Sequence, residues 1–155
     1  GDHKSIFEGI QERMEISKKQ VSEAIDIIEN KESEEQLIQR IIEKAIKHDF
    51  SIKEAIIFEA EIEKNKYKKA VKILGNYYGE WGNQHAQKFR LDKSEKDLKN
   101  AIKNFRNGLK FNPTNSFIYC NLALSLCDSI ILNGEPYSFD EALSLFEKAA
   151  NLKTD

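Results

Sequence analysis

Apolar residues recur every three or four positions along most of the chain, with polar residues between them. This spacing places the apolar side chains on one face of an α-helix, and no stretch shows the sustained alternation of a β-strand. The pattern therefore predicts an all-α protein. Two runs show it best: Leu37, Ile38, Ile41, Ile42, Ala45 and Ile46, and then Ile52, Ala55, Ile56, Phe58, Ala60 and Ile62.

Serine residues mark the expected helix starts. Three positions after each of these serines stands a Gln, Glu or Asp, so the two side chains can satisfy backbone N–H groups in the first helical turn. The pairs are Ser17 with Gln20, Ser33 with Gln36, Ser51 with Glu54, Ser94 with Asp97, and Ser138 with Glu141. An earlier helix is predicted by the spacing of Ile6, Ile10 and Met14.

The C-terminal third carries a more specific pattern. Ala101, Phe105 and Gly108 place a small, an aromatic and a small residue along one helix, and Pro113 follows where that helix must end. A second small–aromatic–small set follows, and a large–large–small–large set lies between the two. Together these residues resemble the tetratricopeptide (TPR) family. The later sets are Tyr119, Leu122, Ala123 and Leu126, and then Ala142, Phe146 and Ala149.

The resemblance implies antiparallel helical hairpins stacked as a TPR-like right-handed α-solenoid, here of about 7–8 helices. We expect residues 1–50 to form an N-terminal TPR-like segment and residues 51–155 a TPR array, all in one continuous helical domain. An earlier hairpin is expected over 51–84, after which Trp81 would open the next helix through about Phe89. The turn-rich stretch 132–137 would lengthen the last hairpin.

A TPR array recognises partners through the concave face formed by its first helices. In the best-defined hairpin, the resemblance places five residues in this groove: Phe117, Cys120, Asn121, Leu124 and Asp128. Asn121 stands where peptide-binding members of the family use an asparagine to bond the ligand backbone, since an amide both donates and accepts. Alternatively, Asn121 is an exposed helical residue or caps a neighbouring loop.

The family's carboxylate clamp for chaperone tails needs further basic and amide residues. Gly82 and Ala86 stand at the lysine and asparagine positions of the preceding repeat, so no chaperone tail is expected to bind. Tyr77, Tyr78 and Trp81 form an aromatic cluster that either fills gaps between repeats or marks a binding surface.

Charge is unevenly distributed although the net charge is only −2. Residues 51–112 carry 14 basic and 8 acidic groups, whereas the flanking segments are acidic. The basic middle either attracts an acidic partner or is a solvated lysine-rich surface, as on the run Lys64, Lys66, Lys68, Lys69 and Lys72. The small net charge gives no case for nucleic acid as a partner.

The two cysteines, Cys120 and Cys127, are too far apart on one helix for a disulfide. We expect free thiols, buried as small apolar residues, and hence a reducing, cytoplasmic setting. The sequence shows no signal peptide at its start and no apolar run of the ~18 residues that cross a bilayer, so no membrane partner is expected.

Residues that could carry catalysis are not grouped in the sequence. His3, His48 and His85 are scattered without Cys or carboxylates at ligand spacing, and no glycine-rich phosphate loop or nucleophile elbow occurs. We therefore expect no catalytic residues, no metal site and no cofactor, and no enzymatic activity.

The sequence thus favours a scaffold that binds a peptide or partner protein through the concave face of a TPR array. One alternative is a regulatory or sensor segment of a longer signalling or effector protein. A second is self-association into a homo-oligomer, because an uncapped last hairpin would expose Leu145 and Leu152.

Overall fold

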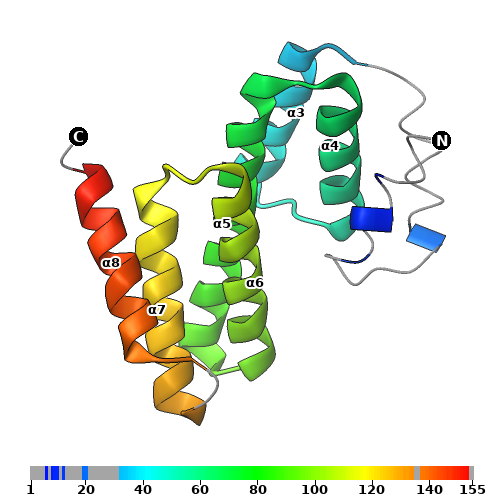
Figure 1. Ribbon diagram of the computed structural model, residues 1–155. Coiled ribbons are helices and arrows are strands. Elements are labelled where there is room, and N and C mark those ends of the chain that lie inside the picture. The colour runs from blue at the N-terminus through cyan, green and yellow to red at the C-terminus, as the bar shows by residue number, and fades with distance from the viewer. Residues whose placement is uncertain are drawn as a thin grey trace. The chain divides into compact units, whose positions relative to one another are not determined.

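The structure is a computed structural model that describes residues 32–134 and 137–153, together with positions 6, 8–10, 12 and 19–20. Within these residues every regular element is helical, which confirms the all-α prediction (Figure 1). The helices are α3 (Glu34–Ile46), α4 (Ile52–Asn65), α5 (Lys68–Asp92), α6 (Glu95–Phe111), α7 (Ser116–Asn133) and α8 (Phe139–Lys153).

Serine side chains begin four of these helices, as predicted. Ser33 forms a full capping box with Gln36, in which each side chain accepts from the other residue's backbone N–H. The hydroxyls of Ser51, Ser94 and Ser138 accept hydrogen bonds from backbone N–H groups three residues on. The expected start at Ser17 and the apolar residue Met14 lie outside the described residues.

Helix α5 differs from the prediction. It runs for 25 residues without interruption, so Trp81 lies inside a helix and does not open one. Proline is missing from this segment, and its three glycines do not break the helix because they lie buried at packing contacts. The expected hairpin over 51–84 followed by a new helix is therefore wrong. The single helix α5 spans both the expected second helix of that hairpin and the expected helix that Trp81 would open.

The chain divides into two compact units, residues 1–74 and 75–155. In the first unit, α3 packs beside α4. Leu37 and Ile41 of α3 are fully buried, and α4 is buried along one continuous run from Ala55 to Ile62. This run includes the side chains of Glu59 and Glu61, so α4 buries polar as well as apolar residues and its amphipathic pattern is weak.

In the second unit, residues 75–92 of α5 pack against α6 and α7. Gly75 lies against Asn112 and Gly82 against Phe105, so α6 runs antiparallel to α5. Hydrogen bonds join Asn76 to Asn115 and Asn83 to Asn121. The residue numbers rise together in these pairs, so α7 runs parallel to α5. Helix α7 also packs against α8 (Figure 1).

The core of this unit lies between α5, α6, α7 and α8, and α5 contributes Ala86 and Phe89. About half of its members come from the positions that the TPR resemblance identified, including Ala101, Phe105, Leu122, Ala123 and Leu126. The lengthening of the last hairpin is mostly helical, because α7 continues through Asn133 and the turn begins at Gly134.

Helix α7 has the length and composition of a membrane span, which the sequence analysis did not expect. Packing explains part of its apolar character, since α7 contacts α6 on one side and α8 on another. Ile118, Leu122 and Leu126 are buried in these contacts. About a third of the helix is buried in the structure.

Candidate binding pocket between α5 and α7

Four asparagines gather around a pocket of about 420 Å³ in the second unit. Helix α5 contributes Asn76 and Asn83, the N-cap of α7 contributes Asn115, and α7 contributes Asn121. The remaining lining residues are Gly79, Glu80, Phe117 and Ile118. The pocket therefore offers amide groups, one carboxylate and an aromatic ring.

Hydrogen bonds between asparagines fix the two helices in register. Asn121 Nδ2 donates to Asn83 Oδ1 at 2.9 Å. Seven residues earlier on α5, Asn76 Oδ1 accepts from Asn115 Nδ2 and from Asn112 Nδ2, both at 2.9 Å. The Asn115 side chain also caps α7 by accepting from the Ile118 backbone N–H. These side chains are thus held in place before any ligand arrives.

Close approach of the helices makes these bonds possible. A Cβ atom built on Gly79 would lie 2.8 Å from Ile118 Cδ1, which is closer than carbon atoms pack. On the α6 side, a Cβ on Gly75 would lie 2.7 Å from the Asn112 backbone nitrogen. A glycine inside a helix costs about 1 kcal/mol relative to alanine. Here the missing side chains let the neighbouring helices come near enough for short asparagine side chains to meet.

Several polar atoms of the pocket have hydrogen-bonding capacity left. Among the described residues no hydrogen bond engages Asn76 Nδ2, Asn83 Nδ2 or Asn121 Oδ1. Two donors on α5 therefore stand beside an acceptor on α7. A peptide bond carries one acceptor and one donor, so this arrangement matches the backbone of an extended polypeptide.

Only two of the five residues predicted for the groove line the pocket. Phe117 and Asn121 line the pocket, and the Phe117 side chain is 68% exposed. Leu124 is exposed at 40%, whereas Cys120 and Asp128 are half-buried; these three do not line the pocket. Sequence reasoning missed Asn76, Glu80, Asn83 and Asn115. A detectable signal was the recurrence of asparagine 38 or 39 residues apart.

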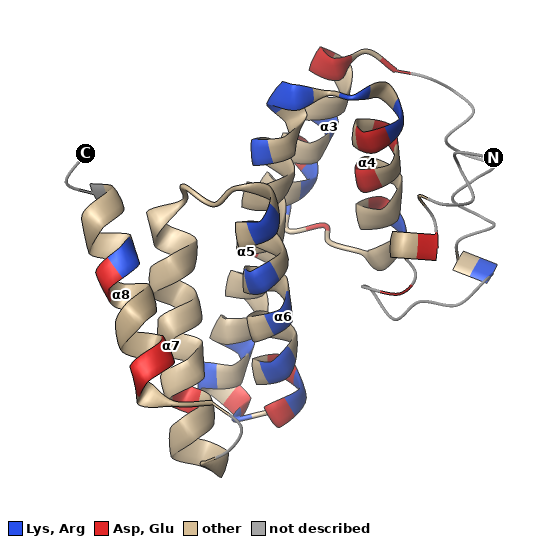
Figure 2. Cartoon of the chain, viewed as in Figure 1, with Lys and Arg blue, Asp and Glu red and all other residues tan. Residues whose placement is uncertain are grey.

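Charge is distributed unevenly over this unit. Basic residues repeat every three or four positions along α6 (Figure 2): Lys96, Lys99, Lys103, Arg106 and Lys110. In contrast, Asp128 is the sole charged residue of α7. Of the eight residues that line the pocket, only Glu80 is charged. The pocket is therefore mildly acidic although its sequence neighbourhood is basic.

The aromatic cluster is mainly a core feature. Tyr77 and Tyr78 are fully buried, and Tyr78 stacks on Phe111 with ring centroids 5.8 Å apart. Trp81 is partly exposed and stacks on Tyr78 and on His85. The two tyrosines are therefore core residues, as one of the two interpretations expected.

Both cysteines are free, as expected, but neither is buried. Cys127 packs against the core with part of its surface open, and Cys120 is likewise half-exposed. The prediction of buried thiols is wrong because α7 turns these positions toward the edge of its contacts, while Leu122 and Leu126 take the core positions.

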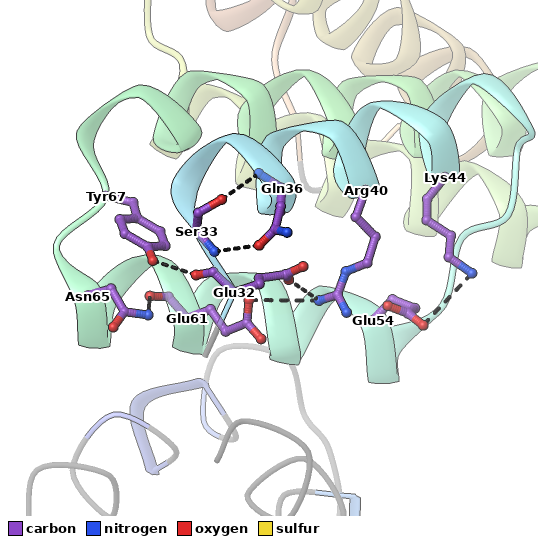
Figure 3. Close-up of polar contacts among 9 residues, drawn as sticks. All are labelled: Glu32, Ser33, Gln36, Arg40, Lys44, Glu54, Glu61, Asn65 and Tyr67. Carbon is purple, nitrogen blue, oxygen red and sulfur yellow. Dashed lines mark hydrogen bonds and ion pairs between the residues drawn. The ribbon is translucent and has the colours of Figure 1, made fainter. Parts of the chain in front are cut away.

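A second polar cluster, in the first unit, was not foreseen from the sequence (Figure 3). Arg40 Nη2 of α3 lies 3.0 Å from Glu32 Oε1 and 3.8 Å from Glu61 Oε2 of α4. The Arg40 guanidinium also lies over the Phe58 ring, at 5.1 Å from its centroid. The Tyr67 hydroxyl donates to the Glu32 carbonyl at 2.6 Å. One cation is thus shared by two carboxyl groups.

Burial and, after it, the adjacent Glu32 raise the pKa of Glu61, Arg40 opposes them, and the net result is a pKa of about 8. The Glu61 carboxyl is 2% exposed, so ionising it would leave a second negative charge with little water around it. Glu61 therefore holds its proton at neutral pH.

His85 and Asp97 form a third contact that the sequence analysis did not identify. His85 Nδ1 lies 2.9 Å from Asp97 Oδ1, and this interaction, with Lys88 nearby, lowers the pKa of Asp97. The pair links α5 to the first turn of α6. In the described part of the chain no group of His, Cys, Asp and Glu has the arrangement of a metal site.

Comparisons with protein-family models, with curated proteins and with solved structures found no match to this chain. What the pocket binds is therefore inferred from its own residues.

Proposed function

We propose that this chain is a protein-interaction module that holds an extended segment of a partner polypeptide in the pocket between α5 and α7. The observation that carries this proposal is the set of amide groups fixed around the pocket, with two donors and one acceptor left open. A peptide backbone carries one donor and one acceptor at each non-proline residue, so it offers matching groups along its whole length.

The dimensions of the pocket support an extended ligand. Asn76 and Asn83 lie seven residues apart on α5, about 10 Å along a helix axis. An extended chain advances ~3.3 Å per residue, so about three ligand residues would span this distance. The exposed ring of Phe117 offers an apolar contact for one ligand side chain, in the way that aromatic residues anchor many interfaces.

The arrangement of the second unit also supports a TPR-like interpretation. Two parallel helices, α5 and α7, line the pocket, and the antiparallel α6 lies between them in sequence and packs against both. TPR arrays place their first helices in this way, so that the groove lies on one side of the stack. The uninterrupted α5 departs from the family's pattern, and the proposal for the TPR family rests on residues 75–153.

We propose a binding role rather than a catalytic one. The pocket lining holds neither a nucleophile nor a histidine, and Glu80 has no second titratable group beside it in that lining. General acid–base chemistry needs a partner group within hydrogen-bond reach of the reacting atom.

The test is selection of random peptides on the intact protein, followed by calorimetry with the tightest peptide. Asn83→Ala combined with Asn121→Ala should weaken binding about thirtyfold, since two hydrogen bonds contribute about 1 kcal/mol each. Asn100→Ala on α6, whose side chain is outside the pocket, is the matched control. If no peptide is enriched, or if the double variant binds as tightly as the control, the proposal is wrong.

Self-association is a second candidate, favoured by the exposed face of α8. Phe139 and Leu143 lie one turn apart and are 59% and 57% exposed. The sequence analysis named Leu145 for this role, but Leu145 packs against the core of the unit. Leu143→Glu should abolish any dimer seen by light scattering at high protein concentration, and a monomer in the unsubstituted chain would remove this candidate.

A further inference from the structure

Glu80 is the only charged residue in the lining of the pocket, and it is exposed. No Lys, Arg or His of the described residues forms an ion pair with it. On α5 it stands between Asn76 and Asn83, four residues after the first and three before the second. These three side chains therefore share one helix face, with the carboxylate between the two open amide donors.

A second carboxylate lies farther along the same pair of helices. Asp128 is on α7, seven residues beyond Asn121, which is about 10 Å or two helical turns. It too has no ion-pair partner among the residues the structure describes. A chain that continued from the pocket would meet Asp128 on α7 and, at the same level of α5, Arg90, which stands seven residues beyond Asn83. Both signs of charge therefore occur beyond the pocket, and the uncompensated negative charge is that of Glu80 in the lining.

The basic residues that favoured an acidic partner lie elsewhere. The row on α6 projects from a helix that contributes nothing to the pocket lining. Part of that row is also engaged already, since Arg106 bonds Glu141 at 2.9 Å and Lys99 pairs with Glu95 at 3.4 Å. The charge of segment 51–112 as a whole is therefore a poor guide to the charge of the pocket.

We infer that the segment held between α5 and α7 is basic, with a Lys or Arg side chain that pairs with Glu80 while the asparagines bond its backbone. This inference rests on the proposed function and adds the chemical class of the ligand. An acidic segment would bring a carboxylate against Glu80 with no cation in the lining to compensate it. Such like-charge contacts are an effective means of rejecting wrong partners.

The test uses three synthetic pools of ten-residue peptides with the same neutral background. One pool contains two lysines, one contains two glutamates, and one contains neither. Binding of each pool to the intact chain is measured by fluorescence anisotropy at low salt. The basic pool should bind about fivefold more tightly than the neutral pool, which is the strength of one favourable exposed ion pair. The acidic pool should bind more weakly than the neutral one.

Charge reversal then assigns the preference to Glu80. Glu80→Lys should make the chain prefer the acidic pool, and Asp128→Lys should reduce the preference for the basic pool without reversing it. Glu147→Lys, the same charge change on an exposed position of α8, should leave the order of the pools unchanged. Raising the salt to about 0.5 M should shrink the differences, because screening acts on exposed pairs.

The possible outcomes separate this inference from the proposed function. If all three pools bind equally and Glu80→Lys changes nothing, the inference is wrong while peptide binding stands. If Glu147→Lys alters the preference as much as Glu80→Lys, the effect comes from net charge and the inference is again wrong. If no pool binds, the proposed function fails together with the inference.

Discussion

The Asn121 side chain donates a hydrogen bond of 2.9 Å to the Asn83 side chain, which lies 38 residues earlier on a parallel helix. This bond joins two helices that are not consecutive in the chain. It also engages one polar atom of each amide, so that Asn83 Nδ2 and Asn121 Oδ1 keep hydrogen-bonding capacity. The pair thus contributes to the stability of the unit and to the shape of the proposed binding site.

The first prediction concerns the energy of this pair. Each single substitution, Asn83→Ala or Asn121→Ala, should lower the free energy of unfolding by about 1 kcal/mol. The double variant should lose less than the sum, with a coupling energy of about 0.5–1.5 kcal/mol, because the second substitution removes a bond that is already broken. Urea denaturation of the four proteins checks this, and strictly additive losses would show that the bond does not form in solution.

The second prediction concerns Gly79. Gly79→Ala should destabilise the chain by about 1–3 kcal/mol, because the new methyl group meets Ile118 Cδ1 at 2.8 Å. This loss outweighs the gain in helix propensity. Ile118→Val removes the opposing Cδ1 atom, so Gly79→Ala should cost less in an Ile118→Val background than alone. Equal costs in the two backgrounds, measured by thermal denaturation, would contradict the proposed contact.

The third prediction is the pH dependence set by Glu61. In the folded chain Glu61 keeps its proton up to about pH 8, whereas the unfolded chain loses it near the ordinary pKa of 4.5. Above pH ~4.5 ionisation therefore stabilises the unfolded state alone. The contribution of Glu61 to stability is fully present below that pH and is lost as the pH rises to about 8.

Glu61→Gln should remove this fall in stability between pH 5 and 8, since glutamine stays uncharged over about that whole range. The neighbouring groups Glu32, Arg40, Glu54 and Tyr67 remain in both proteins, so the comparison reports Glu61 together with its coupling to them. Glu63→Gln, at an exposed position two residues on, is the control and should follow the unsubstituted chain. Parallel stability curves for Glu61→Gln and the unsubstituted chain would rule out the protonated carboxyl.

The fourth prediction concerns Asp97, whose pKa is lowered mainly by its hydrogen bond with His85. A lowered carboxyl pKa contributes stability above the ordinary value of 3.8, and this stability is lost as the pH falls through the folded-state pKa. Asp97→Asn should therefore destabilise the chain at pH 6 by about 1–3 kcal/mol and much less near pH 2. His85→Gln should reduce the effect of Asp97→Asn, which a double-mutant cycle measures.

Local signals in the sequence predicted much of the fold. Helix starts at Ser33, Ser51, Ser94 and Ser138 could be read because a capping serine and its partner are three residues apart. The core positions around Phe105 and Leu122 could be read because their spacing repeats within one helix. Both signals depend on near neighbours in the chain.

The continuity of α5 was not predicted, because family spacing suggested a turn where the residues themselves allow a helix. Gly75, Gly79 and Gly82 were ambiguous, since glycine marks turns as well as close helix contacts. The asparagine pairs and the carboxyl pair at Glu61 join residues that are distant in the chain. These contacts form only where two helices pack at a particular relative register. The periodicity within one helix does not predict that register.

Helix α8 has a consequence for how the chain emerges during synthesis. Helix α7, with the composition of a membrane span, is complete once Asn133 has been made, but its cover on one side begins only at Phe139. Until α8 follows, the apolar surface of α7 that will meet it stays open to other nascent chains, chaperones or lipid. The surface of α7 that meets α8 is therefore covered only after α8 itself has been made and has folded back.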